Sequence, residues 1–215
     1  MVNVFGRAAV LTIIILTAWF LLSSALEGDR NTRLLAQIDA VTTQENAIMS
    51  YLTYLETTND SERYCAVLNE HIQLQNEKLF PLVALLDEAR ENSLQNQYDL
   101  VRQRFISANA QLFFSLKTFQ TKCPDSTDFK QPILYFYPDG PCTDCLIQAQ
   151  ILNEVRDACK TPIQIFAFPV EGTSEVSSLL VKDYSIQKTP SLVIEDKVYE
   201  GVQTKNKLNS LLQCN

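Results

Sequence analysis

The chain has 215 residues, 18 lysines and arginines against 25 aspartates and glutamates, a formal net charge of −7, and no cluster of basic residues. Nucleic-acid binding is therefore not expected, because the phosphate backbone is bound by clustered lysines and arginines. The single histidine, His71, disfavours a histidine-based metal site or a Ser-His-Asp triad, and five glycines leave little for a glycine-rich phosphate loop.

An uncharged stretch, residues 8–26, lies near the start of the chain. At about 1.5 Å per residue, a helix of this length approaches the ~30 Å hydrocarbon core of a bilayer. The stretch predicts a transmembrane anchor within residues 1–27 that attaches the chain to a membrane. A cleaved signal peptide is the alternative, because small side chains at Ser23 and Ala25 would permit cleavage after Ala25.

Basic residues flank this stretch on both sides, with Arg7 before it and Arg30 and Arg33 after it. The positive-inside rule therefore does not set the orientation. The six cysteines, an even number, favour an oxidising compartment. We predict a single-pass protein of the cell membrane, with the N-terminus in the cytoplasm and the C-terminal domain outside it. A C-terminal domain in the cytoplasm is the alternative, and it would require reduced cysteines.

Residues 28–123 carry no strand signal. Their apolar residues recur at steps of three and four in three series, a heptad-like pattern that predicts three consecutive helices. Short breaks near residues 57–60 and 91–93 favour antiparallel neighbours, and Pro81 predicts a kink in the second helix. We expect an antiparallel helical bundle or hairpin that forms a stalk. It would serve as a packing module or, alternatively, as a surface for self-association.

The pattern changes after residue 126 to short apolar runs that alternate with amphipathic segments. Their order is βαβαββα, which predicts an α/β domain over residues 130–215, with a mixed sheet and helices on both faces. The expected strands are residues 132–137, 163–168, 191–194 and 197–199, and the expected helices are residues 142–160, 174–183 and a last one around Leu208 to Leu212.

Two cysteines, Cys142 and Cys145, lie where the first strand of this domain passes into its first helix. Two intervening residues in a first helical turn bring the sulfurs within bonding distance. The unpaired N–H groups and the positive end of the helix dipole favour the thiolate of Cys142, lowering its pKa from the usual ~8.5. Cys142 is thus the expected nucleophile, and Cys145 the expected resolving thiol of a mixed disulfide.

Together with Thr189-Pro190, which directly precedes a predicted strand, this motif and element order resemble the thioredoxin superfamily over most of residues 130–215. The resemblance implies a thioredoxin-like fold in which Pro190 is cis and faces the CxxC motif. It also implies that the backbone of Thr189 pairs with the substrate chain, and Pro141 is grouped with these two as a substrate-binding position. The Cys142–Cys145 pair would be the redox group, with no other cofactor.

The motif departs from thioredoxins proper. Pro141 replaces a tryptophan, Thr143-Asp144 replaces Gly-Pro, and the buried acid of the family would fall near Phe136. Asp144 disfavours the Cys142 thiolate by like charge, so we expect tuning by Thr143 and Asp144 toward a less oxidising pair than the strongly oxidising periplasmic members. Half a zinc site and a static disulfide are the alternatives. Zinc would need two further ligands at suitable spacing, so no metal is predicted.

Six cysteines allow 15 pairings. If the second and third stalk helices are antiparallel, Cys65 and Cys123 lie together at one end. The thioredoxin-like arrangement implies that the helix starting at the CxxC and the last helix end side by side, which pairs Cys159 with Cys214. Both disulfides would be structural.

The predicted function is that of a membrane-anchored thiol–disulfide oxidoreductase that acts on protein thiols and disulfides and exchanges electrons with an unidentified redox partner. The alternative is a non-catalytic, membrane-tethered interaction or scaffold protein. In that case the thioredoxin-like module would be a rigid unit held by disulfides.

Overall fold

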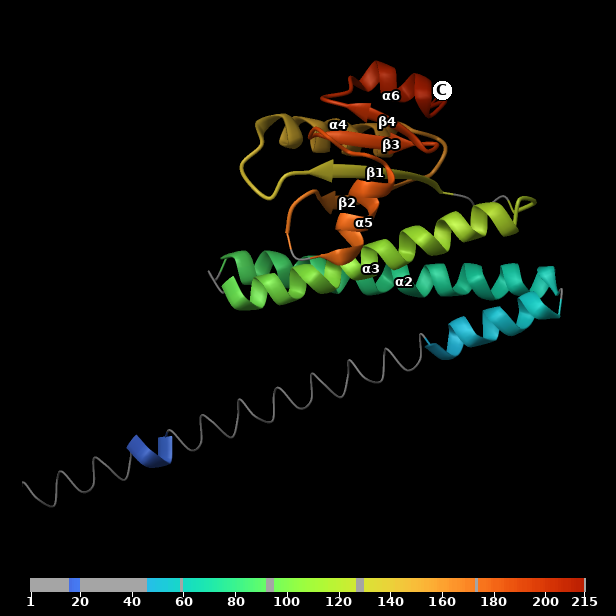
Figure 1. The fold of residues 1–215 in the computed structure, drawn as a ribbon, viewed down its shortest axis with the longest axis horizontal. Helices are drawn as coiled ribbons and strands as arrows, with labels where there is room; N and C mark the ends of the chain where they lie inside the picture. Colours follow the sequence, from blue (N-terminus) through green and yellow to red (C-terminus); the bar gives the residue numbers. More distant parts are fainter. Residues whose placement is uncertain are drawn as a thin grey trace, which may run out of the picture. The chain divides into compact units, whose positions relative to one another are not determined.

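The structure is a computed structural model that describes residues 16–19, 46–58, 60–91, 95–126, 130–172 and 174–214. The chain divides into two compact units, Met1–Thr58 and Asn59–Asn215. In the first unit, residues 16–19 and 46–57 are helical. The second unit contains the long helices α2 and α3 and a four-stranded sheet with its own helices (Figure 1).

The predicted fold class included a transmembrane helix, and the structure corrects this prediction. Within the described ranges, no helix is both long and apolar enough to cross a membrane. The two longest, α2 and α3 with 31 and 28 residues, each contain several charged side chains. Of the predicted span, residues 8–26, four are described. The remainder lies outside the described residues, as does the start of the first predicted stalk helix up to residue 45.

Helices α2 (Ser61–Glu91) and α3 (Gln95–Lys122) form an antiparallel hairpin. Asp60 caps α2, because its Oδ1 accepts the N–H of Arg63 at 3.2 Å. Pro81 lies inside α2. A disulfide between Cys65 and Cys123, with Cα atoms 5.8 Å apart, joins the first turns of α2 to the end of α3. The open end of the hairpin is therefore covalently closed.

The sheet has four strands in the order β2-β1-β3-β4. β1 and β2 are parallel, whereas β3 is antiparallel to both β1 and β4. The sheet is therefore mixed, as predicted. The strands are β1 (Gln131–Tyr137), β2 (Ile163–Pro169), β3 (Ser191–Ile194) and β4 (Lys197–Glu200).

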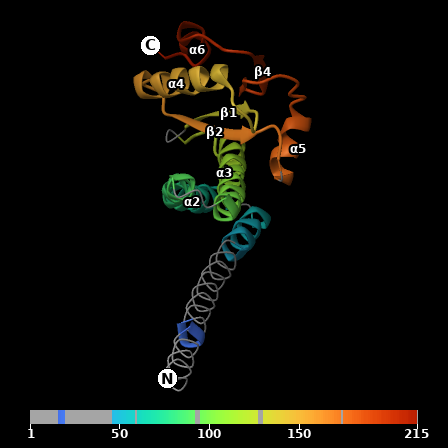
Figure 2. The same cartoon turned by 90° about the vertical axis from the view of Figure 1, so that its left-hand side faces the viewer.

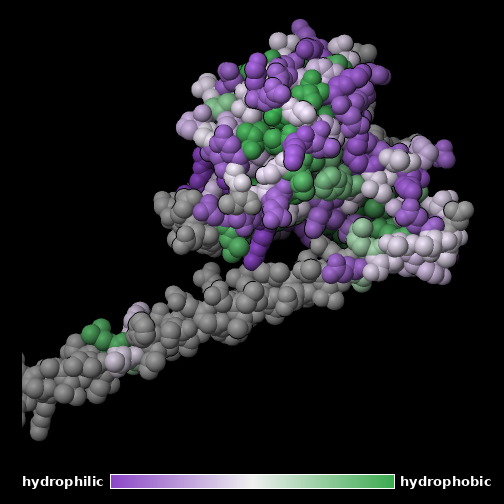
Figure 3. Space-filling model, viewed as in Figure 1, coloured by the Kyte–Doolittle hydropathy of each residue, from purple (hydrophilic) through white to green (hydrophobic). Residues whose placement is uncertain are grey.

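Helices cover both faces of this sheet (Figure 2). On one face lie α4 (Thr143–Ala158) and α6 (Lys205–Leu211), and on the other lie α5 (Glu175–Asp183) and α3. β1 is buried on both sides, because successive residues of a strand point to opposite faces. The core beneath α4 and α6 contains Ile133, Tyr135, Leu152, Val155, Leu192, Leu208 and Leu212. The visible surface of the unit is mostly hydrophilic, with apolar side chains gathered in a few patches (Figure 3).

The sequence pattern predicted a third helix, but it did not predict that α3 packs against the sheet as well as against α2. Three residues on one side of α3 contribute to this contact. Asn109 Nδ2 donates to the carbonyl of Ala167 at 3.2 Å, and the Phe113 ring meets the Phe166 ring edge-on at 5.4 Å. Lys117 Nζ lies 3.0 Å from both carboxylate oxygens of Asp196. These contacts cross the predicted boundary between residues 123 and 130.

Replacement of Phe113 by alanine tests this packing. Phe113 is 4% exposed and its neighbour Phe114 is 47% exposed. We expect Phe113→Ala to lower the free energy of unfolding by about 3–5 kcal/mol, because it leaves a cavity between α3 and the sheet. Phe114→Ala should cost about 1 kcal/mol or less. Urea unfolding of the two variants measures the difference, and equal losses would contradict the packing described here.

Candidate redox site

The CxxC motif lies at the C-terminal end of β1, where the chain turns into α4. Cys142 is the N-cap of α4, with extended backbone angles (φ −146°, ψ 100°). Its Sγ accepts the backbone N–H of Cys145 at 3.1 Å, so a sulfur satisfies one of the unpaired donors of the first helical turn. The two cysteines form a disulfide with Cα atoms 5.2 Å apart. A negative charge on Cys142 would be stabilised by this donor and by the helix dipole.

The two cysteines differ in their access to solvent. Cys142 is half-buried, whereas Cys145 is 6% exposed and belongs to the core beneath α4. Pro141, Thr143 and Asp144 are exposed around Cys142. An incoming thiol or disulfide can therefore reach Cys142 from the solvent, while Cys145 can react with Cys142 from the core side.

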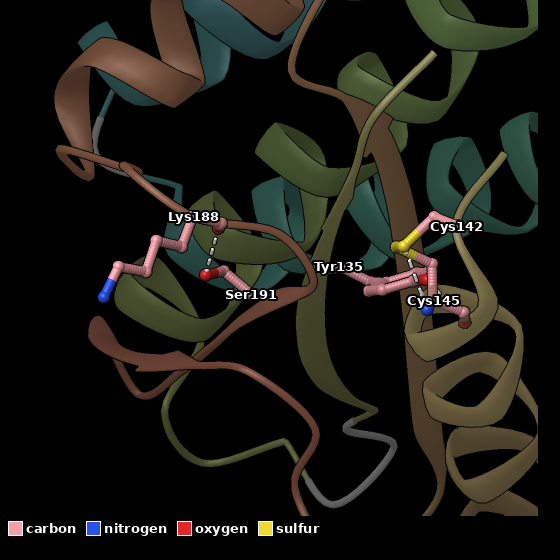
Figure 4. The surroundings of a disulfide bond; sticks show 5 residues. All are labelled: Tyr135, Cys142, Cys145, Lys188 and Ser191. Carbon is pink, nitrogen blue, oxygen red and sulfur yellow. Dashed lines mark hydrogen bonds between the residues drawn. A yellow bond between two sulfur atoms is a disulfide. The ribbon is translucent and has the colours of Figure 1, made fainter. Parts of the chain in front are cut away.

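Tyr135 of β1 supports the motif from below, and its side chain points toward the two cysteines (Figure 4). Its hydroxyl donates to the carbonyl of Cys145 at 2.7 Å. Burial, with a smaller contribution from Tyr137, raises the pKa of Tyr135 to about 12, so the phenol keeps donating above the pH at which an exposed tyrosine ionises. Phe136, near which a family acid would fall, is fully buried and packs on Phe168. The residue that faces the motif from β1 is thus a tyrosine.

The Thr189–Pro190 segment lies at the same edge of the sheet. The peptide bond between these residues is cis. β3 begins at Ser191, which pairs with Phe136 in the antiparallel register, so Pro190 directly precedes the point where β1 ends and the CxxC loop begins. Pro190 is buried and its carbonyl accepts the N–H of Gly201 at 2.8 Å, while Thr189 is half-buried.

Two further interactions stabilise the turn before β3. Ser191 Oγ donates to the carbonyl of Lys188 at 2.7 Å (Figure 4). The ammonium of Lys188 is largely exposed and lies 3.9 Å from Glu200. The segment that precedes β3 is therefore held to the open end of the β3–β4 hairpin, where Ser191 pairs with Glu200.

The other four cysteines are also paired in the structure. Cys159 caps the C-terminus of α4 and bonds to Cys214, which follows α6, with Cα atoms 4.6 Å apart. The full length of α4 separates this disulfide from Cys142. All six cysteines lie in the described ranges, and none of them is free. No cluster of three or more histidine, cysteine or acidic side chains that could hold a metal ion is found in the described parts of the chain.

Sequence reasoning missed three residues around the motif. Gln148, fully buried in α4, accepts the N–H of Gln203 at 2.6 Å and so connects α4 to the segment before α6. Tyr135 could have been found from strand alternation, because it shares the face of β1 that α4 covers. Arg102 of α3, which forms an ion pair with Asp139 in the CxxC loop, had no local signal, because the two are 37 positions apart.

Comparison with known proteins gives likenesses among solved structures. No protein-family model matches the chain, and no curated protein matches it. Among solved structures, it is similar to a crystal structure of a mutant of the thioredoxin-like protein BC3987. The identity is 25%, the match covers 39% of this chain and 96% of that one, and the TM-score is 0.31. The mixed sheet and the helices on both of its faces agree with the arrangement that the sequence predicts for residues 130–215.

Alkaline titration tests the environment of Tyr135. Its pKa in the folded state, about 12, lies above the usual value of 10.0, so its contribution to stability is complete below about pH 10 and is lost as the pH rises toward 12. We expect Tyr135→Phe to lose less stability than the parent between pH 10 and 12. At pH 7, loss of the buried hydrogen bond should cost about 1–2 kcal/mol. Denaturant midpoints across this range measure both effects, with the exposed Tyr54→Phe as control.

Proposed function

We propose that this protein is a thiol–disulfide oxidoreductase that works through the Cys142–Cys145 pair. The observation that supports this most directly is the asymmetry of the pair. The half-buried sulfur is the N-cap of α4 and accepts a backbone N–H, while its partner is enclosed in the core. A purely structural disulfide has no need of a helix N-terminus that stabilises a thiolate.

The reaction follows from this geometry. In the reduced protein, the Cys142 thiolate attacks one sulfur of a substrate disulfide, which forms a mixed disulfide and releases the first substrate thiolate. The Cys145 thiolate then attacks Cys142 Sγ, closes the intramolecular disulfide and releases the second substrate thiolate. Overall, two electrons and two protons pass from the cysteine pair to the substrate. The reverse sequence oxidises a dithiol substrate, and a separate redox partner restores the starting state.

The substrate is proposed to be a polypeptide. Pro141 is exposed next to Cys142, and the half-buried Thr189 lies just before β3, whose first residue pairs with Phe136 near the end of β1. An extended chain beside Thr189 could pair with its backbone while presenting a sulfur to Cys142.

We further propose that the protein works in an oxidising compartment. Two disulfides, Cys65–Cys123 and Cys159–Cys214, each join the end of one helix to a neighbouring helix and close long loops of 58 and 55 positions. Disulfides of this kind stabilise a fold by restricting its unfolded state, and they persist in oxidising surroundings.

Trapping of the mixed disulfide tests the proposed function. We expect the Cys145→Ala protein to form a stable adduct, through Cys142, with a synthetic peptide that contains one intramolecular disulfide. Cys142→Ala should form none, because the remaining cysteine is buried. Non-reducing electrophoresis with mass spectrometry of the adduct is the measurement. Absence of the adduct, together with a Cys142–Cys145 bond that glutathione leaves unchanged, would contradict the proposed function and favour a non-catalytic scaffold protein.

The reduction potential provides a second test. The residues between the cysteines include no histidine or lysine, and Asp144 places a negative charge beside Cys142, which disfavours its thiolate. We expect a potential well below the ~−120 mV of the most oxidising family members. Asp144→Asn should raise it by about 10–20 mV, equivalent to about 0.5–1 kcal/mol. Equilibration with glutathione buffers measures both values, and a parent potential near −120 mV would contradict the expectation.

A further inference from the structure

The loop between β1 and Cys142 is held by a residue from outside the α/β domain. Arg102 of α3 forms an ion pair and hydrogen bond with Asp139, which lies three positions before Cys142. The two side chains are 21% and 30% exposed. The corresponding pair farther along α3, Lys117 with Asp196, is more open at 34% and 61%. Water therefore screens the pair near the CxxC motif less than the distant one.

The β2–α5 loop encloses the Asp139 carboxylate from another side. Gly172 has a φ of +117°, and a Cβ at this position would lie 3.0 Å from Asp139 Oδ2. Side chains are disfavoured at Gly172 on both grounds. The N–H of Val170 also donates to the carbonyl of Tyr137 at 2.8 Å. The carboxylate is thus confined between α3 and this loop, with the guanidinium of Arg102 as its counterion.

Contacts continue from Arg102 to the cysteines. Arg102 also interacts with Tyr137, where burial raises the pKa of the phenol and the guanidinium opposes part of that rise. The Tyr137 ring lies 5.8 Å from the Tyr135 ring, and Tyr135 donates to the carbonyl of Cys145. One arginine is therefore connected through Asp139 to the loop before Cys142, and through two tyrosines to the backbone of Cys145.

We propose that Arg102 is a positioning residue for the redox pair. It neutralises Asp139 and holds the loop, so that Cys142 keeps its place at the start of α4, where its thiolate is stabilised. This inference rests on the proposed function, since it assigns to α3 the control of the reactivity of Cys142. Without Arg102, an unpaired carboxylate would remain three positions before Cys142, and like charge disfavours the thiolate.

Other charged and titratable groups lie on the motif's own helix and on neighbouring segments, and they stay unchanged when Arg102 is replaced. Asp144 belongs to α4 itself, Tyr135 and Tyr137 come from β1, and Lys188 comes from the segment before β3. A change in the thiolate fraction that depends on both Arg102 and Asp139 would therefore report their pairing.

The test is the pH profile of alkylation by iodoacetamide in the full-length Cys145→Ala protein, where Cys142 is the one thiol while the other four cysteines stay paired. We expect Arg102→Gln to move the midpoint of the profile upward by about 0.5–1 pH unit and to slow alkylation at neutral pH by about 3- to 10-fold. Adding Asp139→Asn to Arg102→Gln should return the midpoint to within about 0.2 unit of the parent.

Two further variants separate this role from general stability. Lys117→Gln removes an equal charge from the same helix, where Lys117 hydrogen-bonds Asp196 and lowers the pKa of that carboxyl, and it should leave the midpoint unchanged. Arg102→Lys keeps the charge and should shift the midpoint less than Arg102→Gln does. If Arg102→Gln does not fold, the comparison of Arg102→Lys with Lys117→Gln decides the matter in the same assay.

Equal shifts in the Arg102 and Lys117 variants, or no recovery with Asp139→Asn, would overturn the proposal. The assay needs no substrate and no turnover, so its outcome is independent of the trapping experiment. A protein that traps no peptide but shows the expected shifts would retain the Arg102 assignment and lose the oxidoreductase assignment, and the opposite pair of results would do the reverse.

Discussion

The burial of β1 on both faces is the constraint on which the rest of the second unit depends. Ile133 and Tyr135 point into the core beneath α4 and α6, while Leu134 and Phe136 point toward α3 and α5, and all four are at most 6% exposed. Such a strand is stable when helices cover both sides, because each large apolar side chain returned to water would cost about 1.5–3 kcal/mol. The same strand ends beside Cys142, so the placement of the redox pair depends on the packing that fixes β1.

The covering of the second face explains why the long helices and the α/β domain form one compact unit. α5 has nine residues, and α3 adds a rigid surface of 28 residues on the same side of the sheet. Phe113 supplies an aromatic contact, Asn109 satisfies a strand carbonyl, and Lys117 and Arg102 make ion pairs toward opposite ends of the strands. The helical hairpin is thus part of the structural support of the candidate site.

Features that depend on local sequence pattern could be predicted, whereas features that depend on tertiary packing could not. The strand and helix order of residues 131–211 follows from short apolar runs and amphipathic segments, and the mixed sheet agrees with that order. The pattern of α3 was less informative, because steps of three and four are the same whether a helix packs on another helix or on a sheet. Arg102 and Asp139 come together through that packing, and neither has a neighbour in sequence that indicates it. For the uncharged stretch near the N-terminus, composition alone suggested a membrane-spanning helix. No helix of the described residues is both long and apolar enough to cross a membrane.

The contact of α3 with the sheet has a practical consequence for dissecting this protein. A fragment that starts at residue 130 would contain the whole βαβαββα order and both Cys142–Cys145 and Cys159–Cys214, and by sequence it would look like a complete minimal domain. It would nevertheless leave Phe166, which is fully buried in the intact unit, without its aromatic partner, and would uncover the sheet face that α3 occupies. Exposed apolar sheet surface promotes association between chains. Excision at the apparent domain boundary would therefore yield a fragment that self-associates. A fragment that keeps α3 on the sheet begins before α2, at the junction of the two compact units near residue 59.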